Sequence, residues 1–456
     1  MPLKTMHIGL DDTDSTRKGC TTYIAALIVE KLQKMQNLQF IDYPNLIRLN
    51  PNIPWKTRGN GALCIRIKHH DFLEDLIMET VIELVEKIAD LSWEGTDPGI
   101  VFFKTAKIPR EIQVFSKNAV TGVVRLKTAL QLLKKFGVEA FGFKKGRGII
   151  GSLAAIGETL QSDHTYELIA YRLPKNYGSR RLVDSASIFE MDRVTDHSTF
   201  NNVDYDKKRV IITPRGPDPI LFGIRGEHPD ILKRAFNMVT VLEPVERWLI
   251  FRSNQGTDAH LKQYFKLSEI QAHHPVIVRG TVVTSPKIVP KRHVIFSIAD
   301  ESGRVDCAAY EPTGSLRHIA RKLIRGDCLD VFGGVRASSE SHPLTINLEK
   351  IHILHLAPKI VQQNPNCPKC QKRLKSMGQN QGFRCKHCGL RHRDLRKNEV
   401  AVKRSLRKGL YITSPRSQRH LTKPLRRYGL EKRHGLFQTP ISGWYALSQP
   451  TISEND

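Results

Sequence analysis

Three aspartates near the N-terminus are the residues best suited to chemistry. Asp11, Asp12 and Asp14 follow the apolar residues 6–10, which predict a short strand ending at the acidic cluster. Carboxylates crowded at one strand end repel each other unless a cation lies between them, and Mg²⁺ prefers such oxygen ligands and brings nucleotide phosphates with it. The cluster therefore indicates a catalytic site for phosphoryl transfer from ATP, with a solvated acidic loop as the alternative.

Residues beside this cluster are candidates to bind the phosphates. Thr21 and Thr22 begin a segment with helical apolar spacing, so their hydroxyls lie at the positive end of the expected helix, although a helix-capping threonine is the simpler alternative. The glycine-rich segments 56–61 and 144–148 offer backbone amides and cations. The candidate phosphate-binding residues are Arg17, Lys18, Thr22, Arg58, Gly59, Lys145 and Arg147. The chain has no GxxxxGK[ST] motif, so ATP would need a cradle other than a P-loop.

Four cysteines have the spacing of a structural zinc site. Cys367 and Cys370 form one CxxC pair, and Cys385 and Cys388 form a second pair after fourteen intervening residues. Four thiolates close the tetrahedron that zinc prefers, which leaves no open position for catalysis. The surrounding basic residues would present charge to phosphates; those assigned to nucleic-acid binding are Lys372, Arg373, Arg384 and Lys386. The other four cysteines are scattered, as is typical of reduced thiols.

The charge of the chain points to a polyanionic partner. The 456 residues carry a formal net charge of +26, and residues 361–456 hold 21 Lys and Arg against 5 Asp and Glu. Such a concentrated excess favours RNA or DNA, with a membrane surface as the weaker alternative. No apolar run approaches the roughly 20 residues of a membrane span, and the N-terminus is acidic where a signal peptide needs an apolar core. We therefore expect a cytoplasmic protein without a membrane partner.

The periodicity of the apolar residues predicts several domains of the α/β and β classes. Residues 1–147 alternate strands and helices as an α/β domain, and residues 148–270 do so in the manner of a ferredoxin-like α+β sandwich. Residues 271–357 consist of short strands, residues 358–400 contain the cysteines, and the basic residues 401–456 are weakly patterned and predict a flexible tail. The fold expected is thus multidomain, α/β plus β.

The strand pattern of residues 271–357 is typical of an OB-fold barrel. Strands are expected at 276–283, 293–299, 304–310, 328–336 and 344–353, with a helix at 315–324 between the third and the fourth. Such barrels bind single-stranded nucleic acid through backbone contacts and stacked bases, and the candidate contacts here include Arg279, Arg292 and Phe296. The alternative is a barrel that serves only as a spacer or binds protein.

Several motifs together resemble the archaeal 2-agmatinylcytidine synthetase family. They are HIGLDDTDS at 7–15, GCTTY at 19–23, RLNPNIPWKTRGNG at 48–61, GSLAAIG at 151–157, GPDP at 216–219, GIRG at 223–226 and RSNQGTD at 252–258. The resemblance extends over about residues 6–395. It implies a kinase-like N-terminal domain, a ferredoxin-like domain, an OB-fold and a zinc ribbon; the residues after about 403 extend beyond the part that resembles the family.

The resemblance also implies a reaction and its residues. Family members use ATP to phosphorylate the C2 carbonyl oxygen of the wobble cytidine of an isoleucine tRNA, and agmatine then replaces the phosphate, giving 2-agmatinylcytidine and AUA decoding while ATP ends as AMP and phosphates. By position, Asp11, Asp12 and Asp14 would hold Mg²⁺ and the phosphates, and Thr21 would match a threonine that becomes phosphorylated. Asp218, in a rigid Pro-Asp-Pro turn, is our candidate for the agmatine guanidinium, with a plain turn aspartate as the alternative.

Two other functions remain open from the sequence. A non-catalytic protein that binds single-stranded nucleic acid would explain the barrel and the ribbon but not the acidic cluster or the first half of the chain. A tRNA-dependent ATP enzyme that uses a different amine would explain both. The sequence also leaves open which domain contacts the anticodon loop and which the acceptor stem.

Overall fold

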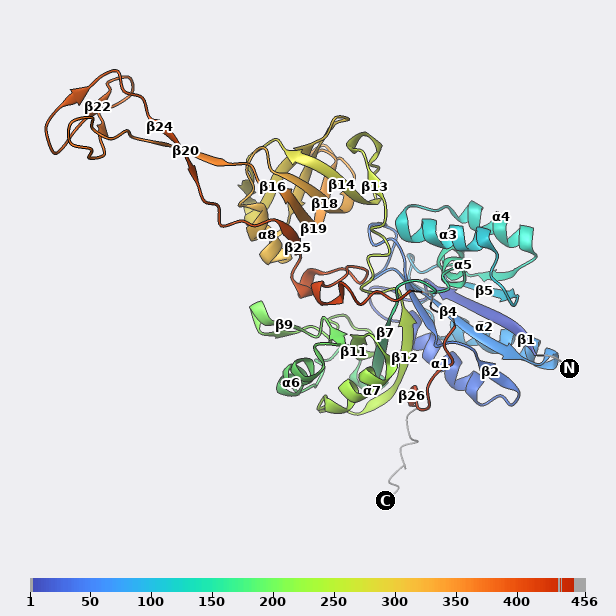
Figure 1. Ribbon diagram of the computed structural model, residues 1–456. Coiled ribbons are helices and arrows are strands. Elements are labelled where there is room, and N and C mark those ends of the chain that lie inside the picture. The colour runs from blue at the N-terminus through green and yellow to red at the C-terminus, as the bar shows by residue number, and fades with distance from the viewer. Residues whose placement is uncertain (1–2, 434, 436, 447–456) are drawn as a thin grey trace.

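The computed structural model of the protein describes residues 3–433, 435 and 437–446 (Figure 1). Two α/β regions form one body, a β-barrel lies beside them, and a small module is set apart at the end of a two-stranded arm. Among the described residues, no helix is both long and apolar enough to cross a bilayer.

The N-terminal half of the main sheet is built around a buried central strand. Its strands run in the order β6-β5-β1-β4-β3, with β2 at the side of β4, and all neighbours are antiparallel. Their bounds are β1 (Lys4–Asp11), β2 (Leu38–Phe40), β3 (Asn45–Arg48), β4 (Gly61–His69), β5 (Gly99–Lys104) and β6 (Glu139–Gly142). Residues 6–10 of β1 are all buried, as the apolar run predicts.

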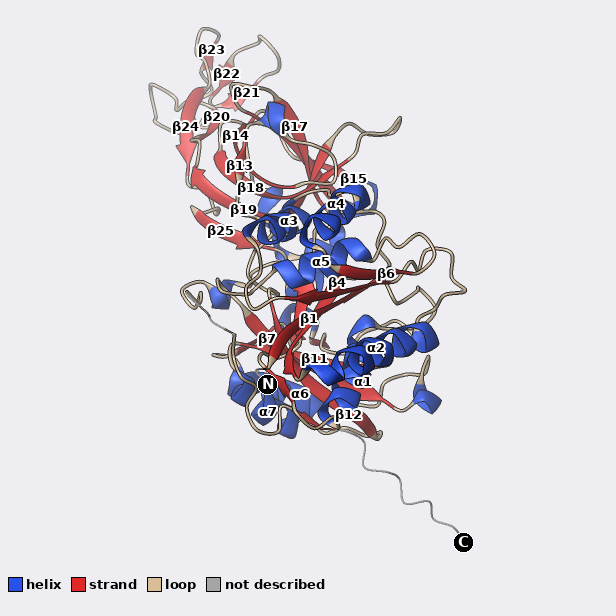
Figure 2. Cartoon of the chain, turned by 90° about the vertical axis from the view of Figure 1, so that its right-hand side faces the viewer, coloured by secondary structure: helices blue, strands red, loops and turns tan. Residues whose placement is uncertain are grey.

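Helices cover both faces of this half. Figure 2 shows α1 and α2 on one side of β1 and α3, α4 and α5 on the other. The helices are α1 (Thr21–Gln33), α2 (Glu74–Ile88), α3 (Arg110–Thr121), α4 (Leu126–Phe136) and α5 (Ile149–Gly157). Side chains alternate along β1, so Met6, Ile8 and Leu10 join the apolar cluster under α1 and α2, while Gly9 lies against α5. α5 follows the boundary expected at residue 147 but packs on this half.

The second region has the β-α-β-β-α-β order of a ferredoxin-like fold, which confirms the expectation. Its strands lie in the order β12-β7-β11-β8 and are antiparallel. The elements are β7 (Thr165–Arg172), α6 (Ser185–Thr195), β8 (Thr199–Phe200), β11 (Ile220–Gly226), α7 (Pro229–Met238) and β12 (Val245–Ser253), with a small hairpin of β9 (Val203–Asp204) and β10 (Arg209–Val210).

One strand pair fuses the two regions into a single sheet. β12 pairs in parallel with β3, where Arg252 lies opposite Asn45 and Ser253 opposite Leu46. The apolar cluster under α1 and α2 continues without a break beneath α7. Residues at the junction of the two halves are therefore held by one continuous core, and a site formed there has a rigid frame.

The barrel that follows is closed by five strands, which confirms the OB-fold. β14 pairs with β18, β18 with β19, β19 with β17, β17 with β16, and β16 returns to β14. The strands are β14 (Pro275–Val282), β16 (His293–Ala299), β17 (Arg304–Ala309), β18 (Cys328–Arg336) and β19 (Thr345–His355), with short additions β13 (Tyr264–Phe265) and β15 (Lys287–Val289). The helix between β17 and β18, α8 (Ser315–Ala320), ends four residues before the expected limit.

The cysteine-bearing module lies at the end of the arm. β20 (Lys359–Gln363) and β24 (Asn398–Val402) pair along the arm and separate the module from the barrel (Figure 1). The module has three short strands, β21 (Lys375–Ser376), β22 (Phe383–Arg384) and β23 (Arg391–His392). Its apolar core consists of Leu374 and Phe383 packed against the cysteines. Such a small core needs a metal for stability.

The expectation of a flexible tail after residue 400 is wrong for the described residues. β25 (Gly409–Ile412) joins the barrel at β19, and β26 (Tyr445–Ala446) joins the main sheet at β12. Trp444 is buried in the main apolar cluster, and the Arg427 side chain is fully buried. Sequence periodicity misses these contacts because the segment is irregular and its few apolar residues are far apart; the end of the expected tail, 447–456, lies outside the described residues.

Candidate active site

A cavity of about 700 Å³ opens where the two halves of the main sheet meet. The acidic loop, the start of α1 and the glycine-rich 56–61 segment line it from the N-terminal half, and the 214–218 turn, β7 and β11 line it from the ferredoxin-like half. The sequence-predicted residues on its wall are Asp11, Asp12, Asp14, Thr21, Thr22, Arg58, Gly59, Arg147 and Asp218. Residues more than 200 positions apart thus share one cavity.

The acidic loop is fixed by close packing at the end of β1. Asp11 is the last residue of that strand, and a Cβ on Gly151 would come within 1.8 Å of an Asp11 carboxylate oxygen, so only glycine fits at the start of α5. Asp12 turns the chain with a φ of 60°. Thr96 Oγ1 donates a hydrogen bond of 2.9 Å to the Asp14 carbonyl oxygen, which fixes the far side of the loop.

Two arginines reach the acidic side chains. Arg147 donates through Nη2 to Asp12 Oδ2 at 2.7 Å. Arg58 Nε lies 3.6 Å from Asp14 Oδ2, and its Nη1 lies 3.6 Å from Asp218 Oδ2. Arg58 therefore links the acidic loop to the Pro-Asp-Pro turn across the cavity. Both guanidinium groups thus lie at the cavity wall beside the acidic loop.

Burial changes the protonation of the loop. Burial and the neighbouring Asp12 carboxylate raise the pKa of Asp11 well above its usual range. Burial raises the pKa of Asp14 to about 6, although Arg58 opposes the shift, and burial likewise raises the pKa of Asp12 against the effect of Arg147. The ionised loop is therefore short of positive charge, which is the condition that a divalent cation relieves.

The two threonines lie at the N-terminus of α1, as the sequence predicts. Thr13 Oγ1 donates a 3.0 Å hydrogen bond to Thr21 Oγ1, and Thr22 Oγ1 lies 3.0 Å from Cys20 Sγ. Neither hydroxyl caps the helix, because Cys20 occupies the N-cap position without a side-chain hydrogen bond. The capping alternative for Thr21 is therefore wrong, and Thr21 is one of the residues that line the cavity.

Three predicted phosphate-binding residues lie outside the cavity. Arg17 forms a two-pronged ion pair with Asp90 at 2.8 Å, and Lys18 lies 3.6 Å from the same carboxylate. Lys145 is exposed, and its backbone N–H donates to Asp97. Proximity in sequence misleads here because the chain turns away from the cavity after Ser15. The side chains of Arg17 and Lys18 then pair with the buried Asp90, which follows α2.

Four further cavity residues have no role in the sequence predictions. Arg48, Glu167 and Arg225 form a charged cluster on the floor, in which Arg225 Nε donates to Glu167 Oε1 at 3.0 Å and Arg48 lies 4.0 Å from Glu167 Oε2. His420, from the expected tail, lies 3.0 Å from an Arg225 nitrogen. Burial, together with Arg48 and Arg225, lowers the pKa of His420 well below its usual range, so the imidazole is neutral. Arg48 and Arg225 stand in family-like motifs, whereas nothing in the sequence marks His420.

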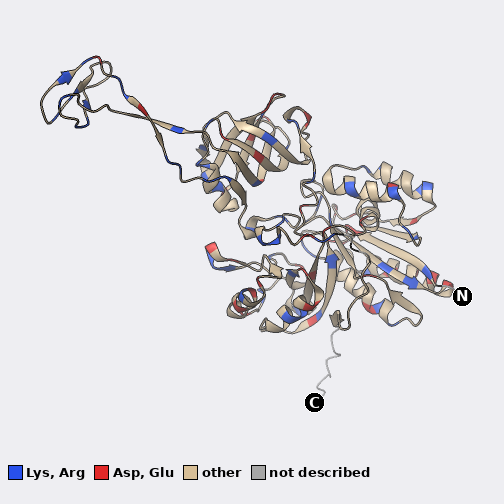
Figure 3. Ribbon diagram, in the orientation of Figure 1, with Lys and Arg blue, Asp and Glu red and all other residues tan. Residues whose placement is uncertain are grey.

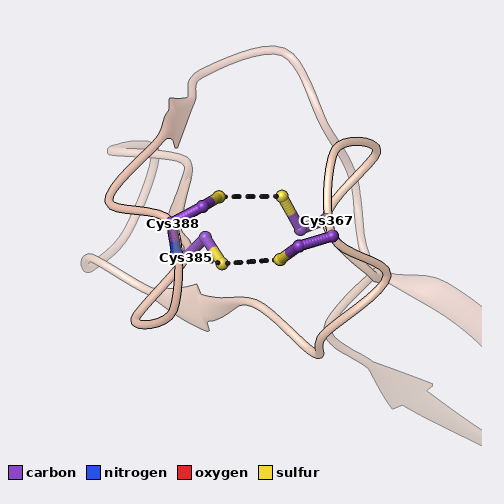
Figure 4. Close-up of side chains that lie close together, drawn as sticks. Cys367, Cys385 and Cys388 are labelled. Carbon is purple, nitrogen blue, oxygen red and sulfur yellow. Dashed lines mark hydrogen bonds between the residues drawn. The ribbon is translucent and has the colours of Figure 1, made fainter.

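The four predicted zinc ligands converge in the arm module. Figure 4 shows the sulfur atoms facing one another, and all four lie within 4.8 Å of each other. The Sγ atoms of Cys367 and Cys388 are 3.6 Å apart, and those of Cys370 and Cys385 are 3.4 Å apart. Zinc–sulfur bonds of about 2.3 Å in a tetrahedron require sulfur separations of about 3.8 Å, so the set fits a closed structural site.

We expect Cys385→Ser to abolish zinc binding and unfold the arm module alone. The module's core is too small to remain folded without the metal, whereas the barrel and main sheet have separate cores. Metal analysis should give one zinc per chain for the wild type and a loss in the variant. Cys328→Ser is the control, because Cys328 lies in the barrel, outside the four-cysteine cluster; full zinc content in Cys385→Ser would contradict the assignment.

The predicted nucleic-acid contacts differ in outcome. Arg292 and the ribbon residues Lys372, Arg373, Arg384 and Lys386 are exposed. Arg279 is also exposed but forms an ion pair of 2.7 Å with Asp330. Phe296 is only 1% exposed in the barrel core, so its assignment as a base-stacking residue is wrong: the side chain that alternates inward along β16 fills the barrel. Figure 3 shows basic residues on the arm and ribbon and among the helices of the main body.

The fold and the cavity together define a class of protein. A barrel of the type that binds single-stranded nucleic acid and a zinc ribbon are joined to a body with an acidic, arginine-bearing cavity, which is the arrangement of a nucleic-acid-directed phosphoryl-transfer enzyme. Family models described as the TiaS TCKD domain and the TiaS FLD domain match residues 7–145 and 146–260. An OB-fold nucleic acid binding domain matches residues 276–354, and the TiaS C-terminal zinc ribbon domain matches residues 364–406.

Relatives and solved structures agree with these matches. The TiaS protein of Staphylothermus marinus, named as a 2-agmatinylcytidine synthetase for an isoleucine tRNA, is 43% identical over 94% of this chain and 95% of its own length. The crystal structure of TiaS with its isoleucine tRNA and ATP is 39% identical with a TM-score of 0.83, and that of TiaS with the tRNA, AMPCPP and agmatine is 38% identical with a TM-score of 0.81; each covers 95% of this chain and 100% of the solved chain. The protein belongs to the TiaS family.

Proposed function

We propose that this protein is the ATP-dependent ligase that joins agmatine to C2 of the wobble cytidine of an isoleucine tRNA. The observation that carries the proposal is the single cavity in which the acidic loop, the α1 threonines and Asp218 meet, in a chain that belongs to the TiaS family. A protein that only binds single strands would need neither the carboxylates nor the arginines between the two halves, and the relatives are named as synthetases.

The C2 carbonyl of cytosine needs activation before an amine can replace its oxygen. Transfer of a phosphoryl group from ATP to that oxygen makes it a good leaving group. The agmatine amine then forms the C2–N bond and loses a proton, while the C2–O bond breaks and phosphate leaves. Across the cavity, Arg58 and Arg147 would stabilise the charge that builds up on the transferred phosphoryl group.

The acidic loop would hold Mg²⁺ through Asp11, Asp12 and Asp14. Their raised pKa values and their packing at the end of β1 support a cation there, and the oxygen-only donor set fits magnesium. Held by these three carboxylates, Mg²⁺ would supply positive charge to offset that of the ATP phosphates. Thr21, beside this loop at the helix N-terminus, is our candidate for the phosphorylated threonine.

Asp218 remains our candidate for the agmatine guanidinium. Its carboxylate is buried at the cavity wall, where Oδ1 accepts from Arg181 at 3.2 Å and Oδ2 faces Arg58 at 3.6 Å. An aspartate that only stabilises a turn would not contact a second cation. The Oδ2 atom is too far from Arg58 for a hydrogen bond, so it can accept one from another guanidinium. Replacing Asp218 should therefore weaken the binding of agmatine more than the binding of ATP.

The barrel and the ribbon would bind the tRNA substrate. We assign the exposed cations Arg279 and Arg292 of the barrel and Lys372, Arg373, Arg384 and Lys386 of the ribbon to phosphate contacts with the anticodon loop and the acceptor stem. The anticodon loop is single-stranded, so the cytidine can leave its stack at low cost. As a tRNA-modifying enzyme, the protein would act in the cytoplasm.

Mass measurement of the RNA tests this function. Incubation of the unmodified isoleucine tRNA with ATP and agmatine should add the mass of agmatine less water to one cytidine, and omission of either small molecule should leave the RNA unchanged. Putrescine and spermidine are the competing amines to include, since they lack the guanidinium. Product from those amines but not from agmatine would point to the other-amine enzyme, and no nucleotide product would leave only a binding protein.

Binding of Mg²⁺ to the free protein should weaken below about pH 6. The folded-state pKa of Asp14 is about 6, so below that pH a proton must leave its carboxyl before the cation binds. Burial raises the pKa of Asp11 as well, so we expect the Mg²⁺ dissociation constant to rise at least about tenfold per pH unit between pH 6 and pH 5, as titration calorimetry would show. Asp14→Asn should bind more weakly and with a shallower pH dependence; a constant affinity from pH 5 to pH 7 in the wild type would contradict the prediction.

A further inference from the structure

A large aromatic side chain stands exposed at the active-site cavity. Trp55 lines the cavity and is 59% exposed, while Trp444 is buried in the main core and Trp248 packs against it. Tryptophan is the side chain with the most apolar surface to lose, and such exposure beside a functional cavity indicates a partner that covers it. Trp55 takes no part in the phosphoryl-transfer arrangement described above.

The loop that carries Trp55 is anchored at both ends. Asn50 Nδ2 donates to the carbonyl oxygens of Gly122 and His273, each at 2.8 Å, and Asn60 Nδ2 donates back to the Asn50 carbonyl oxygen at 2.8 Å. Arg419 Nη1 donates to the Pro51 carbonyl oxygen at 2.9 Å. The ring is therefore presented on a frame fixed by hydrogen bonds, which lowers the entropic cost of binding to it.

The same loop touches the barrel. Asn52 packs so closely on β18 that a Cβ on Gly334 would lie 1.9 Å from its Oδ1 atom. The Trp55 ring centroid lies 6.1 Å from that of His273, a residue of the segment that leads into β14. Trp55 thus lies on the side of the cavity that faces the nucleic-acid-binding barrel.

The charges around Trp55 suit a polynucleotide. Lys56 and Arg58 follow it on the cavity wall, and the Arg419 guanidinium lies at Pro51, at the start of the same loop. Aromatic rings bordered by cations are how proteins bind single-stranded RNA, since the ring stacks on a base and the cations contact the phosphates. Because Trp55 lies beside His273, at the start of the barrel, a base of the RNA is the better occupant than the adenine of ATP.

From the anchored loop, the exposed ring and the adjoining cations we infer that Trp55 stacks on a nucleobase next to the reacting cytidine and so holds that cytidine out of the anticodon stack. The inference rests on the proposed function. It makes Trp55 a substrate-positioning residue, and it links the barrel, which binds the RNA, to the cavity, where the reaction takes place.

Steady-state kinetics with Trp55→Ala test the inference. With an anticodon stem-loop RNA we expect KM for the RNA to rise at least about tenfold, with KM for ATP and for agmatine within about twofold of wild type. Trp55→Phe should recover most of the loss, since it keeps a ring. Trp93→Ala is the matched control: Trp93 is also exposed but packs under Arg17, away from the cavity.

A substrate without the neighbouring base identifies the contact. Stem-loops with an abasic nucleotide on the 5′ or the 3′ side of the target should be poor substrates for the wild type, while at one of the two positions Trp55→Ala should show no further loss. Additive losses at both positions, or a rise in KM for ATP alone, would overturn the inference. Failure of the proposed function would give no product with any variant. Product formed by the wild type on the intact stem-loop therefore shows that a negative result concerns Trp55 alone.

Discussion

Asp12→Asn should reduce ATP turnover about 1,000-fold while the protein stays folded. Asp12 has a φ of 60°, a conformation that asparagine tolerates well, and the amide occupies nearly the same volume as the carboxylate. The variant loses the charge that Arg147 contacts at 2.7 Å and that the proposed Mg²⁺ would need. The variant should therefore lose activity because the carboxylate charge is missing and not because the protein unfolds.

The measurement is release of AMP from ATP in the presence of the RNA, with RNA affinity followed separately by fluorescence anisotropy. We expect the dissociation constant of the RNA to stay within about threefold, since phosphate contacts on the barrel and ribbon dominate binding. Asp71→Asn is the control, because Asp71 is an exposed aspartate of the same domain that pairs with Lys4, away from the cavity. Turnover near the wild-type rate in Asp12→Asn would remove the acidic loop from the mechanism.

Arg427→Ala should destabilise the main body by about 3–5 kcal/mol. The Arg427 side chain is fully buried, its Nη2 donates to Asp163 Oδ1 at 2.9 Å and to Glu227 Oε2 at 3.2 Å, and its Nη1 donates to the Gly256 carbonyl oxygen at 2.6 Å. The alanine variant deprives the buried Glu227 carboxylate and the half-buried Asp163 carboxylate of their arginine and leaves each with a lysine, Lys432 or Lys423, so their desolvation is less well compensated. Thermal unfolding of the main body should shift down by more than about 5 °C.

Arg433→Ala provides the comparison for Arg427→Ala. Arg433 lies in the same segment but is exposed, so its removal should change stability by less than about 0.5 kcal/mol. Equal melting temperatures for the two variants would show that the segment after residue 413 is not part of the folded body. If activity falls together with stability, the segment is needed to hold the cavity in shape. His420, which lines the cavity, belongs to this segment.

The regular parts of the fold could be predicted because their apolar residues repeat with the period of one element. β1 and α1 follow from residues 6–10 and from the spacing after Thr21, and the ferredoxin-like and barrel regions follow from the order of their strands. The zinc ligands follow from the two CxxC pairs alone, because two short loops at that spacing bring four sulfurs together whatever surrounds them. The position of Asp11, Asp12 and Asp14 at a strand end is predicted equally well, since the strand and the aspartates are contiguous in the chain.

Predictions failed where a side chain's direction decides its role. Arg17 and Lys18 are closer in sequence to the acidic loop than Thr21 is, but they pair with Asp90 outside the cavity. Phe296 has the chemistry of a stacking residue, yet the pleat of β16 turns it into the barrel core. A shift of one residue in the strand register would turn the Phe296 side chain outward, and amino-acid composition does not reveal the register.

By itself the sequence determined the local pieces: the acidic strand end, the zinc cluster, the order of elements and the basic character of the chain. Only the tertiary structure decided that β3 and β12 pair to make one sheet, that the cavity opens at their junction, and that the segment after β25 returns to the cavity wall with His420. The physical reason is that local pieces depend on contacts between neighbours in the chain, whereas the cavity depends on contacts between residues hundreds of positions apart, which form only when the common core is buried.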